Sequence, residues 1–185
     1  PHAVQGRATG PLLLVGGNGG GAELGHTVII ANGLDCNAGS YGAVEAYCGR
    51  DGIIRRAVHR LQRGRVSLIR DLVEGDLARV TPRLISEAAE QGDEVALEVY
   101  HEVGEFLGIA IGNMIAVFAP DLVAIGGQVA RAAPFLLDHA VRSARNVAPD
   151  ALFRDVRIVV AERLDDAGIL GAAALAHHST SITAV

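Results

Sequence analysis

Lysine and tryptophan are absent from this sequence of 185 residues, and methionine occurs once, at Met114. All 16 basic residues are therefore arginines. A Walker-type phosphate loop, an enzyme that forms a Schiff base and a lysine general base all need a lysine, so these three classes are excluded. With 21 acidic residues the net charge is −5, which gives no electrostatic footprint for nucleic acid.

Cysteines and long apolar runs are also scarce. Cys36 and Cys48 are too few for a disulfide framework, and no signal-like apolar segment follows a charged N-terminus, so we expect a cytoplasmic location. The longest apolar run, residues 106–119, is shorter than the about 18 residues that a membrane span needs, so no membrane partner is expected. Position 1 is a proline, which predicts that further residues precede it.

Short apolar runs and glycine-rich turns organise the first third of the chain. Residues 12–15 are an apolar run that ends in a glycine-rich stretch, which is typical of a buried strand entering a loop. A second, β-branched run at 27–30 ends at Asn32-Gly33, a turn signal. From 42 to 61 the spacing of the apolar residues predicts a helix with a break at 49–52.

Two capping signals open the helices of the middle third. Thr81 before Pro82 predicts a helix to about Glu90, and Asp93 predicts the cap of a longer helix that ends near Phe118. One apolar stripe of the longer helix has members three and four residues apart: Val95, Val99, Val103, Phe106, Leu107, Ala110, Met114 and Val117. A second stripe lacks side chains and predicts the close approach of another element. Its members are Gly104, Gly108 and Gly112.

Helices alternate with apolar strands in the last third. Residues 122–125 predict a strand buried on both faces, and a helix is expected to begin near Pro134. A strand at 156–161 and a helix of small residues at 167–176 follow. This alternation predicts the α/β class with at least partly parallel strands.

Five arginines crowd one short segment, at Arg55, Arg56, Arg60, Arg63 and Arg65. A basic patch is one interpretation of this segment. We favour a solvated helix face, because nearby acidic residues offset the charge and no aromatic residues alternate with the arginines. Those acidic residues are Asp71, Glu74 and Asp76.

Two carboxylates and an imidazole follow the glycine-rich loop in the sequence and could converge on one cleft. Glu23 and His26 flank a glycine turn, and Glu45 falls in the first turn of the next predicted helix. An ionised carboxylate only accepts hydrogen bonds, whereas a sugar hydroxyl can donate one while accepting another, so such a group suits a polyol. The residues alone leave a second interpretation open, in which Glu45 only meets the helix dipole and the other two are surface residues.

The string around these residues resembles the signature of the ROK family, named for repressors, open reading frames and kinases. It reads Gly-Ala-Glu23-Leu-Gly-His26 and then Cys36-x-Ala-Gly-x-x-Gly-Ala-x-Glu45. The family pattern is Gly-Glu-Leu-Gly-His and then Cys-x-Cys-Gly-x-x-Gly-Cys-x-Glu. Similar stretches come later in the family's order and extend the resemblance to residue 176, namely 107–113, 120–127 and 166–173.

The resemblance implies an actin-like, ribonuclease-H-like ATPase fold whose two lobes hold a sugar and ATP between them. It also implies that a phosphoryl group passes from ATP, with Mg²⁺, to a hydroxyl of a hexose such as glucose. We expect residues 1–10 to be a polar segment, 11–176 the C-terminal lobe with the N-terminal lobe absent, and 177–185 a tail. A homo-oligomer is expected, because the family often forms dimers and the lobe alone would expose apolar surface at 12–15 and 167–176.

The family motif implies roles for five residues of this chain. Glu23, His26 and Glu45 match positions that contact the sugar. Gly126 and Gly127 match the turn on the adenosine side of the nucleotide. That turn lies at the carboxyl end of a predicted strand, where open α/β sheets generally bind ligands.

The zinc site of the family is incomplete in this sequence. His26 and Cys36 match two of its four ligand positions, but the other two hold alanine, which cannot coordinate a metal. These alanines are Ala38 and Ala43. Cys48 is interpreted as a small apolar residue of the helix that carries Glu45. We therefore predict that the loop from Asn32 to Gly42 is held by turns and packing, without zinc.

The catalytic strings of a ROK kinase do not occur in these 185 residues. They are an Asp-x-Gly-x-Thr loop, an Asn-Asp pair whose aspartate is the catalytic base, and a Gly-Thr-Gly turn. No catalytic residue is therefore assigned here. We expect an ATP-dependent kinase as the intact parent and no kinase activity from this chain alone.

Two alternatives stay open beside the kinase. The chain could instead be the ligand-sensing domain of a sugar-responsive ROK repressor, in which case a helix-turn-helix elsewhere in the protein would make DNA a partner. It could also be a decayed relative that keeps the fold without a ligand. The sequence does not specify which hexose is bound.

Overall fold

The structure is a computed structural model that describes residues 12–13, 20–162, 165–177 and 183–184. Its elements, with η for a 3-10 helix, are β1 (Leu12–Leu13), η1 (Leu24–His26), α1 (Val44–Cys48), α2 (Arg50–Gln62), α3 (Leu68–Leu72), η2 (Leu77–Arg79), α4 (Pro82–Glu90), α5 (Glu94–Phe118), β2 (Leu122–Ile125), η3 (Gln128–Ala132), α6 (Ala133–Val147), α7 (Asp150–Phe153), β3 (Arg157–Val160), α8 (Ala167–His177) and β4 (Thr183–Ala184). They form two compact units, Leu24–Ala161 and Pro1–Glu23 with Glu162–Val185.

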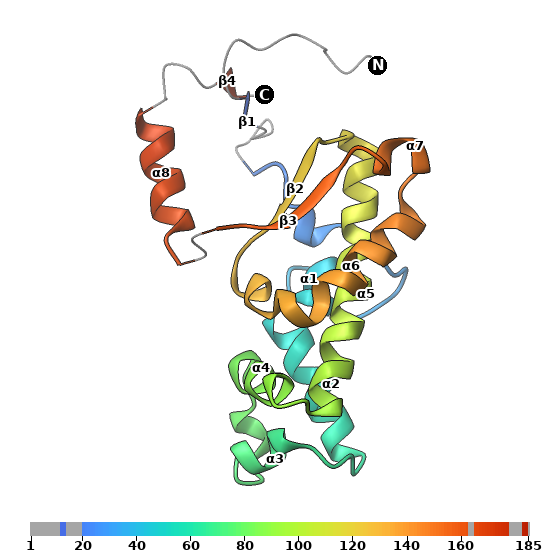
Figure 1. The fold of residues 1–185 in the computed structure, drawn as a ribbon, viewed down its shortest axis with the longest axis vertical. Coiled ribbons are helices and arrows are strands. Elements are labelled where there is room, and N and C mark those ends of the chain that lie inside the picture. The colour runs from blue at the N-terminus through green and yellow to red at the C-terminus, as the bar shows by residue number, and fades with distance from the viewer. Residues whose placement is uncertain (1–11, 14–19, 163–164, 178–182, 185) are drawn as a thin grey trace. The chain divides into compact units, whose positions relative to one another are not determined.

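The larger unit, Leu24–Ala161, is built around the long helix α5 (Figure 1). Helices α1, α2, α4 and α6 all pack against it. Val95, Val99 and Val103 of its predicted apolar stripe are fully buried in the core. By length and composition α5 could cross a membrane. Its packing against five other helices, α7 included, is instead what a core helix shows.

The two predicted helix starts are confirmed. The Thr81 hydroxyl accepts a hydrogen bond from the backbone of α4 at 3.3 Å. The Asp93 carboxylate accepts one from the Ala96 amide at 2.8 Å, at the start of α5. Asp93 is buried, and it also accepts hydrogen bonds from the Ser67 hydroxyl at 3.0 Å and the Leu68 amide at 2.8 Å. One carboxylate therefore joins the start of α3 to the start of α5.

The glycine stripe of α5 packs against α6, as the sequence predicts. A Cβ atom added to Gly108 would overlap the carbonyl oxygen of Ala140, and one on Gly112 would lie 2.6 Å from the Cβ of Val147. Gly104 meets the backbone of α6 in the same way. The two helices approach so closely only because these three side chains are missing.

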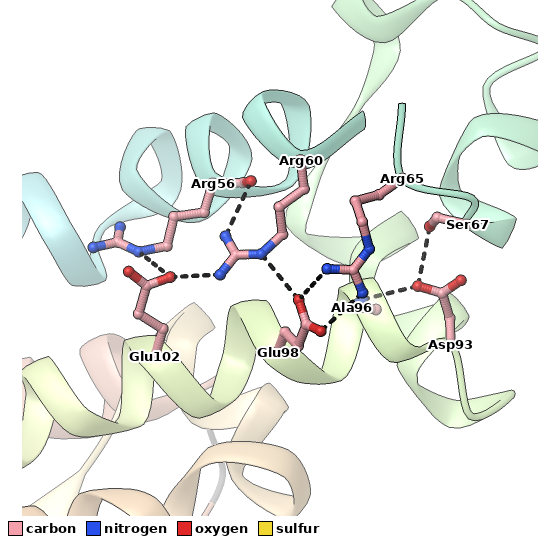
Figure 2. A network of polar contacts seen from close by, with 8 residues as sticks. All are labelled: Arg56, Arg60, Arg65, Ser67, Asp93, Ala96, Glu98 and Glu102. Carbon is pink, nitrogen blue, oxygen red and sulfur yellow. Dashed lines mark hydrogen bonds and ion pairs between the residues drawn. The ribbon is translucent and has the colours of Figure 1, made fainter. Parts of the chain in front are cut away.

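Arginines of α2 and of the turn after it form a ladder with two glutamates of α5 (Figure 2). The Oε2 atom of Glu102 lies 3.3 Å from Nε of Arg56 and 2.9 Å from Nη2 of Arg60. Glu98 lies 3.3 Å from Nε of Arg60, and its Oε1 atom is 2.8 Å from Nη2 of Arg65. Each glutamate thus bridges two arginines, and α2 is fastened to the first half of α5.

Glu74 and Asp76, two of the acidic residues expected to offset these arginines, do not supply the partners. Glu74 pairs with Arg79 at 3.1 Å, and Asp76 accepts a hydrogen bond from the Ala78 amide at 3.1 Å as the cap of η2. Part of the charge of the arginine segment, that of Arg56, Arg60 and Arg65, is therefore offset by glutamates of α5, which tertiary packing brings alongside α2.

Parallel pairing of the strands is confirmed, but the predicted burial of residues 122–125 is wrong. β2 runs parallel to β3, with Leu122 opposite Arg157 and Ile125 opposite Val160, and β1 pairs in parallel with β4. Leu122 is 45% exposed and Ile125 is the one buried residue of β2. Pairing with β3 joins the two strands edge to edge and covers neither face of β2, so the apolar sequence of β2 does not by itself bury it. Val117, assigned to the apolar stripe of α5, is also exposed.

Three local expectations have mixed outcomes. Residues 27–30 contribute one bridge, Val28 to Ala43, and no strand, because the chain turns again directly afterwards. The helix break expected at 49–52 is confined to Gly49, and Gly52 is buried within α2. The apolar residues Ile169 and Leu170 of α8 are exposed, as expected.

Candidate functional site

Backbone hydrogen bonds close the loop of residues 27–43, which carries Cys36 and connects His26 to the helix of Glu45. The Val44 amide donates to the Thr27 carbonyl at 3.0 Å, and the Gly42 amide donates to the Leu34 carbonyl at 2.7 Å. The Tyr47 hydroxyl accepts a hydrogen bond from the Leu34 amide at 2.8 Å. Gly42 has a φ of +79°, a left-handed conformation that favours glycine. Turns and one tyrosine therefore shape this loop.

Cys36 is buried inside the loop, with its Sγ atom 2.9 Å from the hydroxyl oxygen of Ser40. Hydrogen bonds from Ser40, from the backbone of Ala38 and from His26 lower the pKa of the Cys36 thiol to about 7, against the opposing effect of burial. The structure thus brings together His26 and Cys36, the two residues that match zinc-ligand positions.

Glu45 of α1 lies beside the turn that ends in His26. A Cβ atom added to Gly25, the residue before His26, would lie 3.9 Å from Oε2 of Glu45. A Cβ on Gly49 would lie 2.7 Å from the carboxyl carbon of Glu45, so glycine at this position leaves room for the carboxylate. Both Glu45 and His26 are exposed, and their polar groups are open to a ligand.

The other predicted site residues lie as follows. Glu23 is exposed and belongs to the smaller unit, so the convergence of its carboxylate with Glu45 stays a prediction. Gly126 and Gly127 follow the carboxyl end of β2, as expected. Gly127 has φ +73° and ψ −166°, a combination that is essentially restricted to glycine, and it precedes η3.

A pocket of about 1050 Å³ lies between η3 and α4. Val129, Arg131 and Ala132 line it from the η3 side, and Thr81 and Ser86 from the α4 side. The α4 wall has no signal in the sequence, because Thr81 carries only a capping signal and no local pattern joins α4 to η3. The pocket begins two residues after Gly127, which places it next to the glycine pair.

Cys48 is turned toward α5 rather than into the loop. Its buried thiol donates a hydrogen bond to the Val103 carbonyl at 3.7 Å. Burial raises the pKa of the Cys48 thiol to about 12, which disfavours the thiolate that a metal requires. Among the described residues, no three His, Cys, Asp or Glu side chains form a group that could hold a metal ion.

We predict that the purified chain contains far less than one zinc ion per molecule, because one imidazole and one thiolate do not complete a structural shell. Elemental analysis after dialysis measures the content. The double variant Ala38→Cys with Ala43→Cys restores the two missing ligand positions and is expected to raise the content to about one zinc per chain. Stoichiometric zinc in the unaltered chain would contradict the prediction.

Comparisons with known proteins agree with the residue pattern. The model of the ROK family matches residues 6–179. Glucokinase of Thermotoga maritima is 33% identical over 163 residues, which make up 88% of this chain and 51% of that protein. The DNA-binding transcriptional dual regulator NagC of Escherichia coli is 32% identical over 163 residues, or 88% of this chain and 38% of the regulator.

The solved structures include a close match in fold. A ROK family glucokinase from Streptomyces griseus in complex with glucose and AMPPNP superposes with a TM-score of 0.76 at 30% identity. The superposition covers 85% of this chain and 51% of the glucokinase. This chain therefore spans about half the length of the glucokinases that it matches.

Proposed function

The chain belongs to the ROK family, and on that premise we propose that it is the sugar- and nucleotide-binding C-terminal lobe of an ATP-dependent hexose kinase. Its fold is the mixed α/β, actin-like ATPase fold of this family, present in part. The observation that carries the proposal is the exposed Glu45 carboxylate beside the turn that holds His26.

In this proposal the hexose is glucose or a close relative. The Glu45 carboxylate accepts hydrogen bonds from sugar hydroxyls, the His26 ring donates to or accepts from a further hydroxyl, and Glu23 adds a second carboxylate. Support comes from the Streptomyces griseus glucokinase, a similar protein that holds glucose and AMPPNP. Charge-assisted hydrogen bonds of this kind contribute about 1.5–3 kcal/mol each.

We further propose that the adenosine end of ATP lies against Gly126 and Gly127 and enters the pocket between η3 and α4. A Cβ on Gly127 would meet no atom within 4 Å, so the backbone there is open to a ligand. The apolar residues Val129 and Ala132 suit a base, and Thr81 and Ser86 offer hydroxyls. Catalytic-base and Mg²⁺-holding residues are proposed to belong to the N-terminal lobe, and no transfer step is assigned to this chain.

Calorimetric titration of the 185-residue chain with glucose tests the sugar site. We expect weak, saturable binding that Glu45→Gln weakens by about tenfold or more, since a charged acceptor is lost. Glu105→Gln removes the same charge from an exposed position of α5 and is the matched control, expected to leave binding unchanged. Equal affinity of the Glu45→Gln variant and the unaltered chain would overturn the sugar site. Absence of heat with glucose and with mannose would indicate a decayed relative.

A sugar-responsive repressor is the second candidate, because NagC is 32% identical to this chain, almost as similar as the Thermotoga glucokinase. An assay of ADP release in the presence of glucose, performed on the product of the whole reading frame, separates the two. A kinase gives steady, glucose-dependent ADP formation. A repressor gives none, and its affinity for operator DNA changes with the sugar.

A further inference from the structure

A groove of about 690 Å³ lies on the larger unit, over α2 and against α5. Arginines dominate its lining, and we call it the arginine groove: it is lined by Arg55, Arg56, His59, Arg60, Arg63 and Arg65. The apolar side chains of Leu34, Tyr47 and Phe106 line it as well, together with one carboxylate, that of Glu102. None of the residues assigned to the sugar or to the nucleotide contributes to this groove.

The charge of the arginine groove is only partly neutralised. Two glutamates, Glu98 and Glu102, pair with three of its five arginines, which leaves an excess of three positive charges on a chain whose net charge is −5. Both glutamates are used by the ladder of Arg56, Arg60 and Arg65 (Figure 2). A local positive excess on an acidic chain concentrates anions at that place.

The two arginines of the groove that lie outside the ladder, Arg55 and Arg63, stand on either side of His59 in the sequence. Arg55 and His59 are four residues apart on α2, so their side chains lie one above the other, about 6 Å apart along the helix axis, and Arg63 is the residue that caps the end of the helix. All three are exposed. In the described part of the chain no carboxylate forms an ion pair with Arg55 or Arg63, and the Arg55 guanidinium donates only to the Ala46 carbonyl, at 3.4 Å.

The shape of the groove distinguishes it from an ordinary solvated helix face. Its volume is in the range of small-molecule sites. The guanidinium group of Arg56 lies over the rings of Tyr47 and Phe106, at 5.4 and 4.8 Å from their centroids, and the ladder holds Arg60 from both sides. Part of the cationic wall is therefore fixed before any ligand arrives, which lowers the entropy cost of binding.

We propose that the arginine groove binds a small, multiply charged anion that bears phosphate groups. Guanidinium forks match the geometry of phosphate oxygens and can bind them through two parallel hydrogen bonds. Arg55, His59 and Arg63 contact the phosphates, and the exposed side chain of Leu34 accommodates the organic part of the molecule. Duplex nucleic acid does not fit a groove of this size on an acidic chain.

Calorimetric titration of the 185-residue chain with sodium pyrophosphate, at low salt and at about 0.15 M salt, tests the proposal. One saturable site is expected, with an affinity that falls as salt rises. The double variant Arg55→Gln with Arg63→Gln is expected to weaken pyrophosphate binding by about tenfold or more, because two charged donors are lost. Circular dichroism verifies that the variant keeps its helices.

The matched control is Arg154→Gln with Arg157→Gln, which removes the same charge from exposed positions outside the groove. It is expected to keep the affinity of the unaltered chain within about twofold. Equal losses in both double variants, or no saturable binding in the unaltered chain, would overturn the proposal in favour of general charge attraction. Hexaglutamate provides a second test. If it binds more tightly than pyrophosphate, and if Arg55→Gln with Arg63→Gln weakens its binding, the groove binds an acidic protein segment and the proposal is wrong.

Discussion

Replacing Gly108 by alanine is expected to lower the free energy of unfolding by about 2 kcal/mol, although alanine is the better helix former. The gain in helix propensity is about 1 kcal/mol. Against it, the added methyl group would overlap the carbonyl oxygen of Ala140 and lie 2.9 Å from the amide nitrogen of Ala144. These are backbone atoms, so α6 as a whole must move away, and overpacking of this kind costs about 3 kcal/mol.

Urea unfolding of the unaltered chain and of the Gly108→Ala variant measures this loss in the free energy of unfolding. The control is Ala116→Gly, at an exposed position of the same helix, where only the propensity changes and about 1 kcal/mol should be lost. Gly108→Ala adds a methyl group and Ala116→Gly removes one, and both substitutions should lower the free energy of unfolding. A Gly108→Ala variant as stable as the unaltered chain would mean that α5 and α6 pack less closely than described.

Replacing Asp93 by alanine is expected to cost about 3 kcal/mol of stability, because three hydrogen bonds end on this one carboxylate. Loss of the cap of α5 accounts for about 1 kcal/mol. The rest arises because the Leu68 amide and the Ser67 hydroxyl lose their acceptor, and Ser67 is buried. The same urea experiment gives the value.

Two further variants separate the cap from the link between α3 and α5. Asp76→Ala removes an exposed cap with one hydrogen bond, from η2, and should cost at most about 1 kcal/mol. Asp93→Asn keeps one acceptor oxygen and should fall between Asp93→Ala and the unaltered chain. If Asp93→Ala and Asp76→Ala cost the same, the buried link contributes nothing and the expectation is wrong.

Helix starts could be predicted from the sequence because a cap is decided within four residues. Thr81 and Asp93 begin α4 and α5 as expected. Burial of a strand is decided by the elements that cover its faces. For this reason the apolar run at 122–125 wrongly predicted a strand buried on both faces, whereas Leu122 is exposed. The additional links of Asp93 to the start of α3 carry no local signal either, since they cross 25 or 26 residues of sequence.

The sequence could name candidate residues for the site, but it could not give the arrangement of their side chains. The motif brings His26, Cys36 and Glu45 to notice, and the structure places Glu45 beside the His26 turn and Cys36 within reach of His26. Glu23 is assigned to the other unit, and its place in the site stays a prediction. Partners that come from distant elements, such as α4 beside η3 or α5 beside α2, need the fold to be known.

Every positive charge in the ladder between α2 and α5 belongs to a guanidinium group. These groups keep their charge up to strongly alkaline pH. Hydrogen bonding to Arg65 and attraction to it lower the pKa of Glu98, with a further contribution from Arg60. A lowered folded-state pKa means that this stabilisation is present above the ordinary pKa of a glutamate and disappears as the pH falls through the lowered value. The contact between the two helices is therefore sensitive to acid and indifferent to base.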